Sequence, residues 1–118
     1  MSLIQDYFTK RLASSQDFFD KAAKCLRLSR EEEKQCAVLM KSGDAEARQK
    51  IINNYIPFVA SYVKRYSGDK PSLQMIYRCL QALEKLVDKF DFSQDRESFI
   101  RPLSWVLRQE ITRYIAGV

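Results

Sequence analysis

The sequence predicts an all-α protein, a compact helical domain of five or six helices. Only three glycines and three prolines stand among its 118 residues, which leaves little material for the turns of a sheet built from short strands. Apolar residues recur every three or four positions along most of the chain, as they do on one face of an α-helix. A chain of this length encloses a single core.

The first two helices are predicted from this spacing alone, over residues 3–12 and 16–26. Their apolar residues are Leu3, Ile4, Tyr7, Phe8 and Leu12 in the first helix, and Phe18, Phe19, Ala22, Ala23 and Leu26 in the second. We expect both stripes to face the core.

Capping residues mark the third helix, which begins in the stretch LSREEE. Ser29 can accept a hydrogen bond from the first turn, while Glu32 returns one to the backbone of Ser29. Acidic residues in that turn suit the positive end of the helix. The helix should end at Gly43, because glycine readily adopts the left-handed backbone of a C-cap.

Asp44 is expected to cap a long helix over about 45–66, which Pro57 interrupts and should kink. Its expected buried side consists of Ile51, Ile52, Tyr55, Val59, Tyr62, Val63 and Tyr66. After the loop SGDKPS, Ser72 caps a helix over about 73–90. The apolar stripe of that helix is Leu73, Ile76, Leu80, Leu83, Val87 and Phe90.

The last helix, expected over about 98–116, carries two stripes on opposite sides. The apolar stripe is Phe99, Leu103, Val106, Leu107 and Ile111. The other stripe is Arg101, Trp105, Arg108 and Thr112, with Gln109 and Arg113 along its edge. The only tryptophan of the chain therefore points away from the core on a simple helix.

Two interpretations of Trp105 remain open at this point. An exposed indole between arginines suits nucleic acid, because the ring can stack on a base while the guanidiniums hold phosphates. Alternatively, Trp105 packs under the N-terminal helices as core, and the arginines form a solvated face.

Composition restricts the classes of function. The net charge of +5 permits a polyanionic partner without requiring one. Three cysteines without a CxxC pair, together with no histidine, argue against structural zinc and indicate reduced thiols in a cytosolic protein. The sequence has no apolar run of membrane-spanning length and no signal-peptide pattern at its start.

Several stretches resemble regions 1.2 to 2 of bacterial sigma factors of the sigma-70 family. VLRQEITRYIA is similar to the region 2 helix, which typically reads WIRQAITRAIA. Upstream, LSREEE and MKSGDAEARQKII are similar to the segment spanning regions 1.2 and 2.1, VKRYSG to AKRYSG, and VDKFDFSQ to VEKFDPSK. The matches keep their order from about Leu28 to Ala116. Residues 28–118 are therefore expected to form a sigma-like domain, whereas residues 1–27, an N-terminal helical segment, match poorly.

The resemblance implies a transcription initiation factor of the bacterial cytoplasm, which acts by binding and has no cofactor. In the family, this domain docks on the clamp helices of the largest subunit of core RNA polymerase. It also recognises the −10 promoter element and helps to open it. The implied partners are core RNA polymerase and promoter DNA, with an anti-sigma factor as a further candidate and no membrane. The family also uses a domain for the −35 element, so we expect either the N-terminal part of a longer protein or a stand-alone remnant.

Matched positions imply the residues that contact DNA. Gln109, Thr112 and Arg113 fall on residues near the upstream edge of the −10 element, and Arg108 falls on their basic neighbour. Trp105 falls on the first of two adjacent tryptophans. The complete expected DNA-binding set is Lys89, Phe99, Arg101, Trp105, Arg108, Gln109, Thr112 and Arg113.

The melting segment departs from the family pattern. FSTYATWW reads FIRPLSWV in this chain, so Val106 replaces the second tryptophan, Pro102 replaces a melting tyrosine, and Arg101 replaces its threonine. Further upstream, Pro57 replaces a basic residue that lies near DNA. These changes predict altered promoter melting or an altered sequence preference.

The polymerase-docking motif departs further, because DLIQEG reads QMIYRC in this chain. Two carboxylates are replaced by Gln74 and Arg78. The family's clamp surface is rich in arginine, so a basic residue there predicts weaker docking, lost docking or a co-adapted partner. The expected docking residues are Gln74, Tyr77 and Arg78.

Three functions are therefore weighed. The first is a divergent sigma factor domain. The second is a sigma-like regulatory interaction module that has lost polymerase docking. The third is an unrelated helical protein or a small enzyme. The enzyme has the least support, because the chain lacks histidine, a glycine-rich phosphate loop and a nucleophile motif.

Overall fold

The computed structural model describes residues 12–68, 71–92 and 96–117. In this part of the chain five α-helices occur and no strand, which confirms the all-α prediction. The helices are α2 (Ser15–Ala23), α3 (Arg30–Lys41), α4 (Ala45–Ser67), α5 (Leu73–Lys89) and α6 (Arg96–Ala116).

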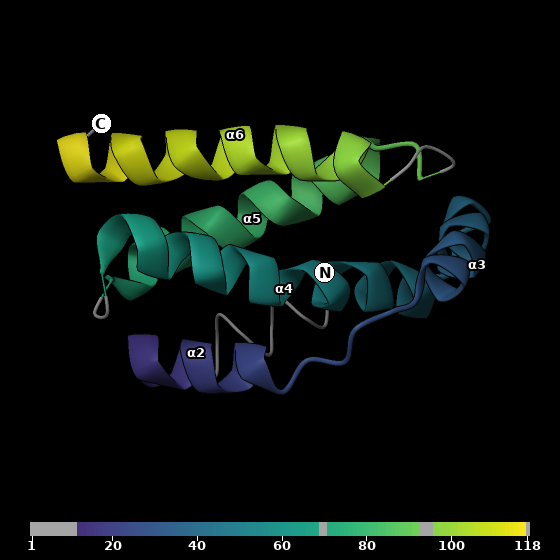
Figure 1. Cartoon of the computed structure of the whole chain (residues 1–118), viewed down its shortest axis with the longest axis horizontal. Coiled ribbons are helices and arrows are strands. Elements are labelled where there is room, and N and C mark those ends of the chain that lie inside the picture. Colours follow the sequence, from purple (N-terminus) through teal and green to yellow (C-terminus); the bar gives the residue numbers. More distant parts are fainter. Residues whose placement is uncertain (1–11, 69–70, 93–95, 118) are drawn as a thin grey trace.

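Helix α4 is the centre of the fold, and it contacts each of the other four described helices. Figure 1 shows α2 on one side of α4, α3 crossing near one end of it, and α5 between α4 and α6. Helices α5 and α6 also pack against each other. The outer side of α6 therefore faces away from the rest of the molecule.

The core collects side chains from both ends of the sequence. Large side chains that are exposed by less than 2% include Phe18, Ile51, Ile52, Ile56, Val59, Met75, Ile76, Leu83, Phe99, Leu103 and Leu107. Most of these residues lie on the apolar stripes predicted for their helices. Burial of such stripes, rather than helix propensity alone, stabilises helices of this length.

The predicted caps are present. Ser29 Oγ accepts a hydrogen bond from the Glu32 backbone N–H at 3.1 Å, and the Ser29 backbone N–H donates to Glu32 Oε1 at 2.9 Å. Asp44 caps α4, and Ser72 caps α5. Helix α3 ends at Lys41 with Ser42 as its C-cap, and Gly43 follows with φ = 95°, so the prediction of a left-handed residue at this end is confirmed.

Several element predictions need correction. Helix α2 ends at Ala23, three residues earlier than expected, and Leu26 is 85% exposed rather than packed in the core. The predicted interruption at Pro57 is wrong. Helix α4 runs through Pro57 without a break, although the proline removes a backbone hydrogen bond. Its neighbour Ile56, and Val59 two residues on, are fully buried and hold this part of the helix in the core. The predicted kink stays a prediction.

The remaining differences are smaller. The helix expected at 3–12 lies outside the described residues apart from Leu12, which is buried. Helix α6 begins at Arg96, two residues before the predicted start. Tyr66, expected on the buried side of α4, is 41% exposed.

Two polar contacts tie distant segments to α4. The Asn54 side-chain oxygen accepts a hydrogen bond of 2.7 Å from the backbone N–H of Leu28, which fixes the segment between α2 and α3. The Tyr55 hydroxyl donates to the carboxylate of Glu33, and both residues are buried. Buried polar groups such as these need partners, since leaving them unpaired is costly.

Candidate nucleic-acid interface on α6

Trp105 lies on the outer side of α6 with 61% of its surface exposed. Leu103 and Leu107, two positions before and after it, are fully buried on the inner side. This exposure contradicts the interpretation of Trp105 as a core residue, whereas its contact with nucleic acid stays a prediction. A large exposed apolar surface of this kind suits a binding partner.

Five of the predicted DNA-binding residues line one hollow on this side of α6. They are Trp105, Arg108, Gln109, Thr112 and Arg113. Their spacing over two turns brings the indole, two guanidinium groups, an amide and a hydroxyl to one surface. The combination offers stacking, phosphate contacts and hydrogen bonds to base edges.

Aromatic side chains of α4 support one wall of this hollow. The guanidinium carbon of Arg108 lies 5.8 Å from the centre of the Tyr66 ring. Tyr66 in turn packs against Tyr62, at 4.7 Å between ring centres, and Tyr62 packs against Phe58 at 5.9 Å. A guanidinium that rests on a ring keeps its edge N–H groups available for a phosphate.

Sequence reasoning missed this aromatic row, although its signal is present. Phe58, Tyr62 and Tyr66 recur every four residues, which places them side by side on a helix. Phe58 and Tyr62 are half-buried, whereas Tyr66 is exposed. Burial raises the pKa of the Tyr62 phenol, and its hydrogen bond with Tyr66 adds to the shift.

Three predicted DNA-binding residues lie elsewhere. Phe99 is fully buried, and its ring centre is 4.5 Å from that of Tyr55, so it is a core residue with no surface to offer DNA. Arg101 is exposed on α6 but does not line the hollow. Lys89 lines a separate groove between α5 and α6.

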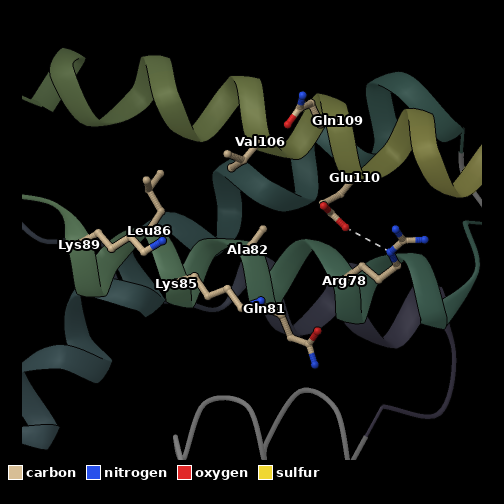
Figure 2. Close-up of a pocket in the computed structure, with 9 residues that line it drawn as sticks. All are labelled: Arg78, Gln81, Ala82, Lys85, Leu86, Lys89, Val106, Gln109 and Glu110. Atoms are coloured by element: carbon tan, nitrogen blue, oxygen red, sulfur yellow. Dashed lines mark hydrogen bonds and ion pairs between the residues drawn. The ribbon is translucent and has the colours of Figure 1, made fainter. Parts of the chain in front are cut away.

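The predicted docking residues lie on α5. Gln74 is exposed, and Tyr77 and Arg78 are half-buried. Arg78 Nε donates to Glu110 Oε1 of α6 at 3.1 Å, which Figure 2 shows as the dashed line between the two helices. Arg78 is therefore engaged in an internal ion pair, and its positive charge is balanced within the domain.

Reversing Arg78 alone should destabilise the domain. In Arg78→Glu, two carboxylates would face each other across α5 and α6, and we expect the free energy of unfolding to fall by about 1 kcal/mol. The swapped double variant Arg78→Glu/Glu110→Arg should recover most of this loss. Urea unfolding of the wild type, the two single variants Arg78→Glu and Glu110→Arg, and the double variant measures the coupling energy between the two residues. If the effects of the two single changes simply add in the double variant, the ion pair is contradicted.

None of the described helices is both long and apolar enough to span a membrane. Among the described residues, no group of cysteine, aspartate or glutamate side chains is arranged to hold a metal ion.

Comparison with known proteins gives one consistent family of relatives. The chain is 40% identical over 90 residues to the RNA polymerase sigma factor SigA of Clostridium acetobutylicum. It is 36% identical over 90 residues to the SigA proteins of Listeria monocytogenes and Listeria innocua. Each match covers 75% of this chain and 24% of the relative, so the chain spans about a quarter of the length of the curated relatives it matches. No protein-family model matches the chain, and no solved structure matches it significantly.

Proposed function

Because this chain contains a domain of the sigma-70 family, we propose that it is a transcription initiation domain that binds core RNA polymerase and recognises the −10 promoter element. The relatives are named RNA polymerase sigma factors, which supports polymerase and promoter DNA as the partners. Bacterial cytoplasm is the corresponding location.

The observation that carries the DNA-binding part is the hollow on α6. Trp105 stacks on an unpaired base, and Arg108 and Arg113 hold the neighbouring phosphates. Gln109 and Thr112 reach base edges at the duplex side of the opening. The role is binding without covalent chemistry, because stacking offsets the cost of removing a base from the duplex.

A second candidate is a sigma-like regulatory module that has lost polymerase docking, or that is held by another regulator such as an anti-sigma factor. The Arg78–Glu110 ion pair favours it. A residue at the expected docking position is already committed to α6, so it is less available to a partner surface.

The only tryptophan of the chain provides a direct test of the DNA-binding part. Stacking on Trp105 should quench its fluorescence when single-stranded DNA containing a −10-like sequence is added. A duplex of the same sequence with no unpaired bases should quench less. The quenching should weaken with salt, because phosphate contacts release counterions. Unchanged emission at low salt would rule out a base stacked on this indole.

Polymerase docking is tested separately, by co-purification of the whole chain with core RNA polymerase. Binding at low salt supports the first candidate. No detectable binding, together with intact quenching by DNA, supports the second.

A further inference from the structure

A groove between α5 and α6 adjoins the candidate DNA-binding hollow, and Gln109 lines both. Leu86 of α5 and Val106 of α6 point toward one another across it, and they give it an apolar floor (Figure 2). Lys85 and Lys89, both exposed, stand along the α5 side. The groove therefore combines an apolar centre with a basic rim.

The rim has an excess of positive charge. At one end, the carboxylate of Glu110 balances Arg78. Within the described part of the chain, no carboxylate forms a salt bridge with Lys85 or Lys89. The acidic residues near them on α5 are occupied elsewhere, because Glu84 and Asp88 both pair with Arg48 of α4 (3.6 and 2.6 Å).

The same charge pattern extends along the whole outer face of α5. Residues at steps of three or four positions share this face, and its one acidic residue, Asp88, is paired with Arg48. The others are Gln74, Arg78, Gln81, Lys85 and Lys89. The predicted docking residues and the groove thus belong to one continuous surface, with the basic residues toward the groove.

The size of the groove favours a protein side chain over a small molecule. Its volume is about 260 Å³, below the roughly 300–1,000 Å³ of typical small-molecule sites. A single apolar anchor residue of a protein partner suits such a space. A phosphate backbone would satisfy the lysines but would leave the floor of Leu86 and Val106 without an apolar partner.

We propose that this groove docks an acidic protein surface, which inserts an apolar side chain between Leu86 and Val106 and places carboxylates against Lys85 and Lys89. The inference rests on the second candidate function, in which α5 no longer docks on the arginine-rich clamp, and it adds the chemistry of the partner that α5 takes instead. Electrostatic complementarity fixes the orientation of the partner, and the buried anchor holds it in place.

The test uses the whole chain and a labelled synthetic peptide of glutamate and leucine at helical spacing, with binding followed by fluorescence anisotropy. Lys85→Glu/Lys89→Glu should weaken binding roughly tenfold. The matched control Lys34→Glu/Lys50→Glu removes the same charge from exposed positions on α3 and α4 and should change the affinity much less. A peptide with serine in place of leucine should bind more weakly, because the floor of the groove would stay unfilled.

Two results would overturn the inference. One is that the glutamate–leucine peptide fails to bind, or binds both double variants equally. The other is that Lys85→Glu/Lys89→Glu selectively abolishes quenching of Trp105 by single-stranded DNA, which would place a nucleic-acid strand in the groove. If the peptide binds through the lysines but core RNA polymerase does not bind at all, the acidic partner is another protein, and only the polymerase part of the proposed function fails.

Discussion

Replacing Phe99 by alanine should lower the free energy of unfolding by about 3–5 kcal/mol, a large fraction of the stability of a domain of this size. Phe99 is fully buried. Its ring centre lies 4.5 Å from that of Tyr55 and 5.0 Å from those of Phe90 and Phe92. Removing the ring would leave a cavity where α4, α6 and the end of α5 meet. Urea unfolding followed by circular dichroism measures the loss.

Two further variants make this prediction specific. Phe99→Leu keeps most of the volume and should cost much less. Ile115→Ala on the same helix removes an apolar side chain that is 66% exposed, so it should change stability by less than about 0.5 kcal/mol. If Phe99→Ala instead weakened DNA binding while stability stayed near that of the wild type, Phe99 would be a contact residue as the family resemblance implied.

Phe99 illustrates how much of the site the sequence could predict. Helical periodicity placed it on the inner stripe of α6, and it is buried there. Matching by family position placed it in the DNA-binding set as well. The position of a residue in a family motif does not show whether its side chain is exposed. Helical periodicity predicts directly which face of the helix the side chain is on. The same periodicity placed Trp105 outside and Leu107 inside, and both placements are confirmed.

The features that sequence reasoning missed depend on contacts between helices. Arg78 and Glu110 lie 32 positions apart, and no local pattern reports that α5 and α6 bring them to 3.1 Å. Tyr66 shares the stripe of Tyr55 and Val59, but it stands near the end of α4, where fewer neighbours cover it. Its exposure and its contact with Arg108 follow from where α6 passes, which periodicity within one helix cannot give.

Apolar spacing was also a poor guide to where a helix ends. Leu26 continues the apolar spacing of α2, yet the helix stops at Ala23, because the chain turns at Lys24 and Asn54 then holds the linker at Leu28. Caps were more informative than spacing. Ser29, Asp44 and Ser72 each mark the observed start of a helix, since a side-chain oxygen can satisfy backbone N–H groups that the helix itself leaves unpaired.

Replacing Trp105 by alanine should weaken binding of single-stranded −10-like DNA by about 5- to 150-fold, the equivalent of losing one stacked base. The same change should leave stability within about 0.5 kcal/mol of the wild type, because the indole is 61% exposed and contributes little to the core. Anisotropy of a labelled oligonucleotide measures the affinity, since this variant has no tryptophan left to observe.

Trp105→Ala should lose DNA affinity and keep its stability, whereas Phe99→Ala should lose stability. Trp105→Phe retains an aromatic face and should recover part of the affinity, whereas Ile115→Ala should bind DNA as the wild type does. Binding of core RNA polymerase through α5 should survive in Trp105→Ala, because the indole lies on the outer side of α6, away from Gln74 and Tyr77. A Trp105→Ala protein that unfolds more easily yet binds DNA unchanged would show that the indole supports the fold, and the hollow on α6 would then lose its stacking residue.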